Sequence, residues 1–467
     1  MSILLIIPLL LSCGGDKTAS KRIKPVKIDF EQIQEKGKLT ALTGYSATSY
    51  FLYKGEPMGY EYELLQRLSD YLGVEIEIRL EKNFDTFFDR LNRGEADLIA
   101  YNLTVTKQRT EIVDFTEHHS FTRQILVQRK PDNWRQMKLH EIEKSLITNP
   151  IDLIGKTVHV TRGSAFVGRL KSLSDEIGGD IEIIEVGGDV TADDLITMVA
   201  EGEIDFTVAD EHVAWISEAY YSNINVETPL SFPQRIAWAV RKTSPELLNS
   251  VNQWISAMQD CTDYYVIYNK YFKNRRAHRT RMKSDYSTVS GTQLSPYDDI
   301  IKKYAAELNW DWRLLASMIY QESEFDPAEK SWAGARGLMQ LMPRTAEAYG
   351  GTNLKDPENN ITAGTNFIKW LENYWQEIPD TTERLKFVLA SYNVGQGHIS
   401  DARKLAEKYG KDADVWDDNV DEFILKKSKK EFYDDEVVNF GYCRGEEPYN
   451  YVREILERYE QYQIHVE

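Results

Sequence analysis

A glutamate that continues an apolar helical stripe is the first residue of this chain that could carry out chemistry. The apolar positions recur at Leu314, Leu315, Met318 and Ile319, and Glu322 falls one turn later on the same face. A carboxyl group held against an apolar wall has its charged form disfavoured, so its pKa rises. Such a group suits a general acid that works near neutral pH. A glutamate near a helix end is more often simply solvated, so this candidate depends on its neighbours.

Three short motifs and a closing segment surround this glutamate in the sequence. Residues 321–325, 334–343 and 390–395 form the ordered motifs, and residues 441–455 form the closing segment. Together they resemble the lytic transglycosylases of the soluble-lytic-transglycosylase type, which share the goose-type lysozyme-like fold. The region lacks runs of alternating polar and apolar residues, which favours helices throughout. We therefore expect an almost wholly α-helical, lysozyme-like domain over residues 297–467.

The resemblance implies a mechanism in which one glutamate makes both proton transfers. Glu322 would protonate the oxygen that links N-acetylmuramic acid to N-acetylglucosamine. As a carboxylate it would then take the proton of the muramyl C6 hydroxyl, which closes onto C1 and gives a 1,6-anhydro sugar. Most glycosidases use two carboxylates. The three motifs contain no acidic residue where a second catalytic carboxylate would be expected, although a distant acidic residue could still fold close to Glu322.

The same resemblance implies roles for residues around the glutamate, and each of them also has an ordinary structural explanation. Substrate contacts would come from Ser323, Met339, Gln340, Tyr392, Asn393 and Tyr451. Ser323 would bond near Glu322 or the sugar, Gln340 would bind polar sugar groups, and Tyr451 would orient Glu322 or bond the glycan. The alternative is that the two tyrosines are core aromatic residues and that Met339 is a packing residue.

A second set of polar residues lies in the first half of the chain. Residues 102–116 resemble the motif of periplasmic solute-binding proteins for polar amino acids. In that family the residues matching Thr104 and Arg109 hold the α-carboxylate of the ligand, and a guanidinium can make two parallel bonds to a carboxylate. Ser164 would open a helix facing the same anion, and Asp210 would pair with the α-amino group. The alternative for Arg109 is a solvated surface residue.

Helix and strand patterns alternate in this first half, which predicts a mostly parallel sheet covered by helices. Residues 91–98 also recur in similar form at 199–206, as two similar α/β lobes would give. We expect a bilobed domain of the periplasmic-binding-protein type II class over residues 38–275. Lobe I would comprise residues 38–125 and 236–275, and lobe II residues 126–235. A basic, then Ser/Thr-rich linker over 276–296 would lead to the helical domain.

The N-terminus is read as an export signal rather than as part of a domain. Residues 3–11 are apolar apart from Pro8, and the segment Leu10-Leu11-Ser12-Cys13 resembles the bacterial lipobox. This implies a signal peptide over residues 1–12, lipid on Cys13, a polar tether over 13–37 and attachment to the periplasmic face of the outer membrane. A basic region before the apolar run is missing, and a buried N-terminal strand is the alternative.

Composition limits the partners of the chain. Its 467 residues carry a formal net charge of −18, which argues against nucleic acid as a partner. Three cysteines cannot form a disulfide framework. The acidic segment 412–422 does not follow calcium-loop spacing, and no zinc-like His/Cys cluster occurs, so neither a metal nor a cofactor is predicted.

Two functions remain open from the sequence. The order of the two domains resembles that of a family of membrane-bound lytic murein transglycosylases, which predicts an enzyme that acts on peptidoglycan glycan strands. Its N-terminal cleft would bind an amino acid or a muropeptide and regulate the enzyme, or it would bind no ligand. The alternative is a lipid-anchored solute or muropeptide receptor whose helical domain only binds glycan.

Overall fold

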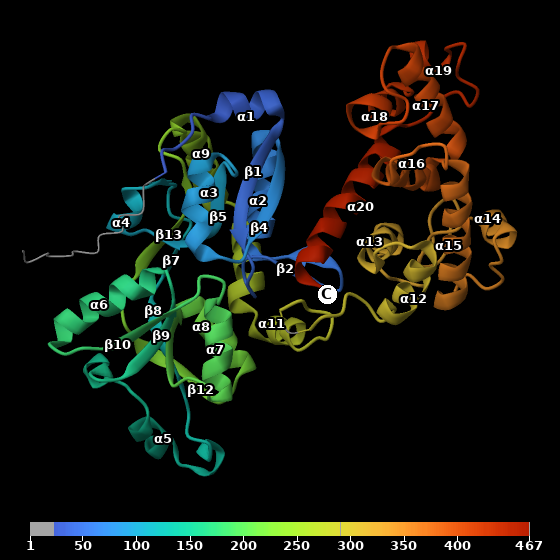
Figure 1. The fold of residues 1–467 in the computed structure, drawn as a ribbon. Helices are drawn as coiled ribbons and strands as arrows, with labels where there is room; N and C mark the ends of the chain where they lie inside the picture. Colours follow the sequence, from blue (N-terminus) through green and yellow to red (C-terminus); the bar gives the residue numbers. More distant parts are fainter. Residues whose placement is uncertain (1–22, 290, 467) are drawn as a thin grey trace, which may run out of the picture.

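The alternating pattern of the first half folds into two separate sheets in the computed structural model, which describes residues 23–289 and 291–466 (Figure 1). In lobe I the strand order is β4-β1-β5-β13-β6, and β7 pairs with β13. These strands are β1 (Lys38–Gly44), β4 (Glu75–Glu81), β5 (Leu98–Thr104), β6 (Asp114–Phe115), β7 (Ser120–Thr122) and β13 (Gln234–Val240). Strand β1 is parallel to β4 and β5, whereas β13 returns antiparallel to β5.

The helices of lobe I bury apolar side chains, except for the shortest, α4, which buries Arg109. They are α1 (Phe30–Lys36), α2 (Tyr60–Leu72), α3 (Phe87–Arg93), α4 (Lys107–Thr110), α9 (Pro245–Gln259) and α10 (Thr262–Tyr268), with turns at Phe84–Thr86 and Asn269–Lys273. Helix α1 corrects the predicted tether, because Ile33 is buried and the capping box of Asp29 and Gln32 fixes the start of the helix. The polar spacer is therefore shorter than residues 13–37. Cys13 lies outside the described residues.

Lobe II contains the second sheet, in the order β10-β9-β11-β8-β12. Its strands are β8 (Gln124–Arg129), β9 (Thr157–Thr161), β10 (Glu182–Val186), β11 (Phe206–Asp210) and β12 (Ile224–Pro229). Its helices are α5 (Leu139–Ser145), α6 (Ala165–Ile177), α7 (Ala192–Glu201) and α8 (Glu211–Tyr220), with turns at Trp134–Gln136 and Pro150–Leu153. The sequence repeat corresponds to a repeated junction, since α3 and α7 both end at a glycine with positive φ, Gly94 and Gly202, before an inner strand.

The second half is helical, as predicted. Its helices are α12 (Asp298–Leu308), α13 (Trp312–Ser323), α14 (Pro343–Ala348), α15 (Pro357–Tyr374), α16 (Thr381–Val394), α17 (Gln396–Lys408), α18 (Asp421–Lys426), α19 (Lys430–Tyr433) and α20 (Glu446–His465), with a turn at Trp416–Val420. Asp311 caps α13 by accepting a bond from the Arg313 amide. Helix α20 crosses the domain and packs on α13 and α16 (Figure 1).

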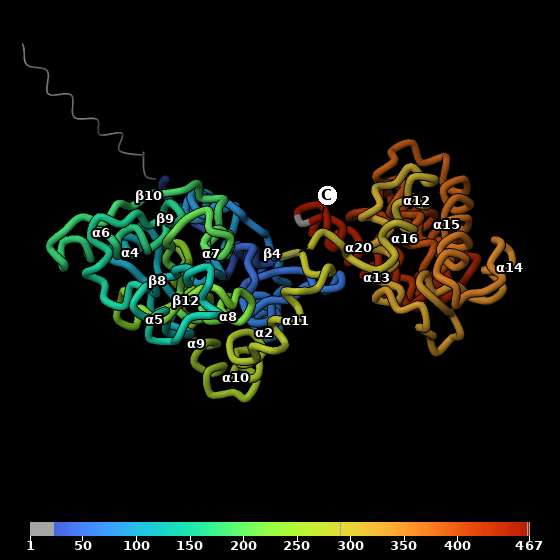
Figure 2. Tube along the Cα trace, turned by 90° about the horizontal axis from the view of Figure 1, so that it is seen from below, coloured from blue at the N-terminus to red at the C-terminus, as the bar shows by residue number. Residues whose placement is uncertain are grey.

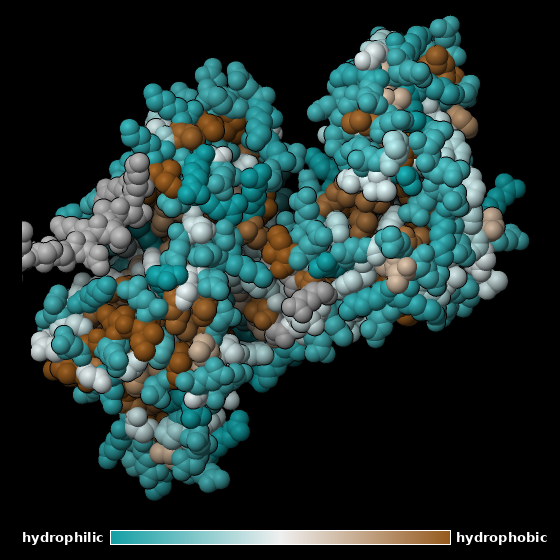
Figure 3. Space-filling model, in the orientation of Figure 1, coloured by the Kyte–Doolittle hydropathy of each residue, from teal (hydrophilic) through white to brown (hydrophobic). Residues whose placement is uncertain are grey.

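A hairpin of lobe I, β2 (Phe51–Tyr53) and β3 (Glu56–Met58), joins the two halves of the molecule (Figure 2). The segment predicted as a linker is partly structured, because it contains α11 (Arg275–Met282) and Thr288 bonds to Leu52 of β2. Beside the hairpin, a groove of about 760 Å³ separates β4 from α20, and Figure 3 shows the hollow between the two halves. Arg453 of α20 closes one end of it with an ion pair to Glu75 of 2.9 Å.

Two further findings concern the described residues of both halves. None of the helices within residues 23–289 and 291–466 is both long and apolar enough to cross a membrane. Cys261 is exposed, Cys443 is buried, and both are free thiols.

Candidate functional site

The last turn of α13 places Glu322 against the packed interior of the helical domain. Burial raises the pKa of its carboxyl group from 4.5 to about 7. The hydroxyl of Tyr451 on α20 donates a hydrogen bond of 2.5 Å to Oε1 of Glu322, which opposes part of that rise. Glu322 is therefore poised to be protonated or ionised near neutral pH, as an acid that later acts as a base requires.

Helices α13 and α20 are held together around this pair by further bonds. Ser317 donates to the carbonyl of Ile455 at 2.7 Å inside the core. The Gln321 amide donates to Glu454 at 2.8 Å, and Arg458 donates to Gln321 at 2.9 Å. These contacts fix the direction in which α20 presents Tyr451 to Glu322.

The loop between α13 and α14 packs against the end of α13 that carries the glutamate. Ser323, next to Glu322, donates to the carbonyl of Leu338 at 2.8 Å, which ties the loop to the helix end. The loop turns at Gly337, where φ is +79° and an added Cβ would lie 2.3 Å from the Asn360 amide nitrogen and from the Leu354 carbonyl oxygen. A side chain cannot fit there, so the glycine allows the close approach of this backbone.

Two residues of this loop that are predicted to contact the substrate make contacts within the protein. Met339 is fully buried against Gly364, and its carbonyl accepts a bond of 2.8 Å from the hydroxyl of Tyr392. Gln340 has a φ of +46°, and its amide donates to the carbonyls of Gly337 and Glu329. The sequence left packing open as an alternative for Met339, whereas the bonds of the Gln340 amide within its own loop were not predicted.

The structure thus brings most of the predicted residues together around Glu322. Tyr451 bonds to it directly, Ser323 follows it, and the negative charge of Glu322 adds to the burial that raises the pKa of Tyr392. Asn393 is exposed at the end of α16. Their roles toward substrate stay predictions.

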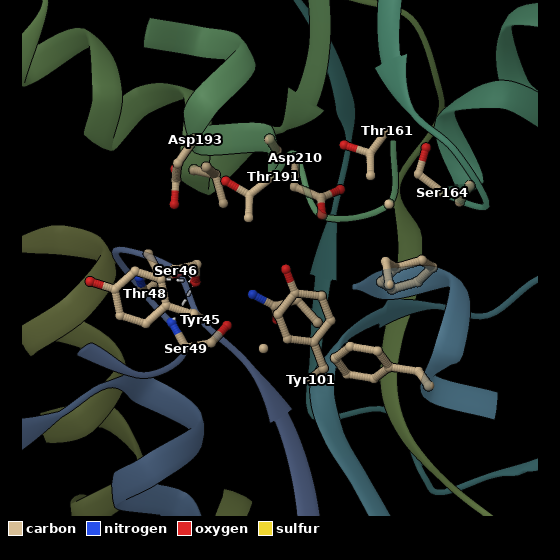
Figure 4. Close-up of a pocket in the computed structure, with 18 of the residues that line it drawn as sticks. Tyr45, Ser46, Thr48, Ser49, Tyr101, Thr161, Ser164, Thr191, Asp193 and Asp210 are labelled. Carbon is tan, nitrogen blue, oxygen red and sulfur yellow. Dashed lines mark hydrogen bonds between the residues drawn. The ribbon is translucent and has the colours of Figure 1, made fainter. Parts of the chain in front are cut away.

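A cavity between lobes I and II contains the second predicted set (Figure 4). It encloses about 90 Å³, and Asp210, Thr161 and Ser164 of lobe II face Tyr101 of lobe I across it. A larger chamber of about 550 Å³ lies next to this cavity and shares lining residues with it, namely Tyr45, Ser46, Thr191 and Asp193. The cleft therefore extends beyond the space lined by the four predicted residues.

Arg109 lies at one end of this cavity as a buried cation. Its guanidinium donates to the carbonyl of Thr104 at 2.9 Å and, across the cleft, to that of Gly163 at 3.2 Å. It also lies over the rings of Phe84 and Phe88, at 5.1 and 5.6 Å. No ion pair of Arg109 occurs within the described part of the chain, and burial lowers its pKa to about 10. A desolvated cation bonded only to carbonyls favours an anionic ligand.

The opposite wall carries polar atoms that lack protein partners. Oδ1 of Asp210 and Oγ of Ser164 are both buried and make no hydrogen bond with any described residue. Burial raises the pKa of Asp210 to about 7, and the charge of Arg109 opposes this rise. Unpaired polar atoms of this kind are costly unless a ligand or water completes them.

Several contacts of this cleft were missed in the sequence. Asp193 accepts a bond of 3.0 Å from the Ala47 amide, and Arg162 pairs with Asp85 at 2.8 Å, so both link the two lobes. The aromatic support of Arg109 was also missed, although the cluster of Phe84, Phe87 and Phe88 immediately after a strand was an available signal.

The described residues contain no group of three or more His, Cys, Asp or Glu side chains that could hold a metal ion. In the acidic segment, Asp414 pairs with Arg403 and Asp417 with Lys386. These carboxylates therefore serve as partners of basic side chains.

Comparisons with known proteins agree with both halves of this description. The family of the transglycosylase SLT domain matches residues 299–415, and family 3 of the bacterial extracellular solute-binding proteins matches residues 38–274. A membrane-bound lytic murein transglycosylase F of Desulfosudis oleivorans is 35% identical over 92% of this chain and 90% of its own length. One of Pseudomonas fluorescens (strain Pf0-1) is 32% identical over 92% and 85%. Among solved structures, an ancestral arginine-binding protein bound to arginine is 24% identical, with a TM-score of 0.42, over 50% of this chain and 98% of that chain.

These matches confirm the fold class, the enzyme class and the family predicted from the motifs. The two domain families occur in the predicted order, and the relatives align with nearly the whole chain. The protein is thus a lyase that acts on peptidoglycan, and its relatives are named as membrane-bound. The chain belongs to the family of membrane-bound lytic murein transglycosylases F.

Proposed function

We propose that Glu322 alone performs the acid and base steps of a non-hydrolytic cleavage. Its proton goes to the oxygen between N-acetylmuramic acid and N-acetylglucosamine, and the bond from C1 to that oxygen breaks. The muramyl C6 oxygen then bonds to C1, and its proton returns to the Glu322 carboxylate. The product is a 1,6-anhydromuramyl end, and no water is consumed. The observation that carries the proposal is the buried Glu322 carboxyl group, whose pKa is raised to about 7 and which accepts a hydrogen bond from Tyr451.

Purified sacculi treated with the protein test this proposal. Wild type should release 1,6-anhydromuropeptides, and Glu322→Gln should release none. Glu324→Gln is the matched control, because Glu324 is the exposed C-cap of the same helix and should be dispensable. Products with reducing ends only would contradict the lyase mechanism.

The N-terminal cleft is proposed to bind the α-amino and α-carboxylate groups of an amino acid or a muropeptide. Arg109, helped by Thr104 and the helix start at Ser164, would hold the carboxylate, and Asp210 would hold the ammonium group. The support is the buried guanidinium without an ion pair in the described chain and the unpaired oxygen of Asp210. A ligand larger than an amino acid would extend into the neighbouring chamber.

Ligand binding is proposed to regulate the catalytic site through the β2–β3 hairpin. This hairpin follows directly after Ser46, Thr48 and Ser49, which line the ligand cavity. At its tip, the Gly55 carbonyl accepts a bond of 2.9 Å from Tyr462 of α20. An added Cβ at Gly55 would lie 3.0 Å from the ring of Tyr320, two residues before Glu322. A ligand that moves the hairpin would therefore act on both α13 and α20.

Regulation requires a ligand that binds two states of the protein with different affinity. Turnover of sacculi should change when a saturating muropeptide is added to wild type, and it should not respond in Arg109→Ala. Equal turnover with and without muropeptide in wild type would remove this part of the proposal.

The last part of the proposed function is that lipid on Cys13 attaches the protein to the outer membrane. The support is the lipobox-like segment before Cys13 and the membrane-bound relatives. Cells fed labelled palmitate should label wild type in the outer-membrane fraction, whereas Cys13→Ala should be unlabelled and released from that fraction. Label retained in Cys13→Ala would contradict the assignment.

A further inference from the structure

A row of aromatic rings leads away from the catalytic glutamate along one face of α15. Phe367, Trp370 and Tyr374 are spaced by three and four residues, so they share that face. The ring of Tyr392, whose pKa is affected by Glu322, lies 5.1 Å from Phe367. Phe367 lies 6.1 Å from Trp370, and Trp370 lies 5.6 Å from Tyr374. The row is therefore continuous with the catalytic site.

The far end of the row is open to solvent although its rings are held in place. Trp370 is 37% exposed and Tyr374 is 42% exposed. Tyr374 packs edge-on against the buried Trp375, and its hydroxyl lies 3.0 Å from that of Ser400. Trp375 in turn donates to Ser391, the neighbour of Tyr392, at 2.9 Å. Rings that stay partly exposed while anchored from behind form a rigid platform with apolar faces.

We propose that Trp370 and Tyr374 form a distal glycan subsite, against which pyranose rings of the peptidoglycan strand stack several sugars away from the cleaved bond. Pyranose rings present apolar C–H faces that match aromatic rings, and their hydroxyls can reach polar groups at the edge of the row such as Ser400. The occupant is a glycan strand because the row begins at Tyr392, beside the residue that cleaves such a strand. The proposal rests on cleavage at Glu322, as given under the proposed function.

The subsite makes the enzyme favour long strands over short ones. A substrate that only spans the cleaved bond reaches Tyr392 and Phe367, whereas a long strand also covers Trp370 and Tyr374. Removal of either distal ring should therefore lower kcat/KM for long strands and leave that for short substrates unchanged. We expect a loss of about fivefold for each ring, which corresponds to about 1 kcal/mol.

The test compares glycan strands freed of stem peptides with a tetrasaccharide of two disaccharide repeats. Trp370→Ala and Tyr374→Ala should each lose activity on the strands only, and Trp370→Phe should keep most of it. Tyr409→Ala is the matched control, because Tyr409 is 52% exposed and packs on Phe423 and Phe432 away from the row. Thermal melts of each variant verify that the domain is folded.

Three outcomes would overturn the proposal: equal losses on both substrates, no loss on either, or the same loss in Tyr409→Ala. The chemistry of the products is read from the same reactions. Reducing ends in place of anhydro ends would refute the proposed function, while the dependence on strand length would still report on the aromatic row.

Discussion

The hydroxyl of Tyr451 should set the pH at which this enzyme loses activity. Burial raises the pKa of Glu322 to about 7, and the bond from Tyr451 lowers it from a still higher value, because it favours the carboxylate. Tyr451→Phe removes that bond and should raise the pKa of Glu322 further. A hydrogen bond to a charged group contributes about 1.5–3 kcal/mol, and 1.36 kcal/mol corresponds to one pKa unit. The expected rise is therefore about one to two units, near the lower value if water takes the place of the hydroxyl.

The pH profile of kcat/KM on soluble glycan strands measures this change. The first step needs protonated Glu322, so activity in wild type should fall as the pH increases through about 7. In Tyr451→Phe the same fall should occur at a pH higher by about one to two units. Tyr392→Phe is the control, since its hydroxyl bonds to the Met339 carbonyl and its removal should leave the position of the fall unchanged. A fall in Tyr451→Phe at the wild-type pH, or at a lower one, would refute the reasoning.

Three further predictions concern Glu322, Asp210 of the lobe cleft and Gly55 of the hairpin. Glu322→Gln should stabilise the protein by up to about 3 kcal/mol above pH 7. The reason is that folding raises the pKa of the Glu322 carboxyl group from 4.5 to about 7, so the wild-type protein loses stability as the pH increases between these values. Denaturant unfolding at a pH below both values should show no gain in unfolding free energy. The affinity for an α-amino acid, measured by calorimetry, should decrease as the pH falls through about 7, because Asp210 then takes up a proton and cannot pair with the ammonium group. An affinity that does not vary with pH would contradict this role of Asp210. Gly55→Ala should destabilise the protein by about 1–3 kcal/mol more than Gly37→Ala. Both glycines have positive φ, but of the two only Gly55 has atoms within 3 Å of an added Cβ. Equal unfolding free energies of the two variants would show that the hairpin contact does not contribute to stability.

Local patterns in the sequence were sufficient to predict the helix that carries Glu322, the carboxyl group that we propose as catalytic. The apolar spacing from Leu314 to Ile319 predicted the face of the helix on which Glu322 lies. The three motifs likewise indicated the family, and the repeat at Gly94 and Gly202 indicated two lobes. These features depend on neighbours within one or two turns, so the sequence contains them directly.

Contacts between distant segments could not be predicted in the same way. Met339 was expected either to contact the substrate or to pack, and only the structure shows that it packs on Gly364 and that the Gln340 side chain bonds to its own loop. The support of Arg109 by Phe84 depends on a turn that lies between two strands. Such contacts depend on how helices and strands pack against one another, and the spacing of residues in the sequence does not predict this packing.

The sequence by itself predicted the reaction class, the two-lobed binding module and the carboxyl group that we propose as the acid, because short motifs and periodic patterns are enough to indicate them. Only the tertiary structure decided that α20 brings the Tyr451 hydroxyl onto Glu322, that the β2–β3 hairpin reaches from the ligand cleft to the catalytic helices, and that aromatic rings continue the site along α15. The physical reason is that a pKa, a mechanical link and a binding platform depend on distances and burial between segments far apart in the chain.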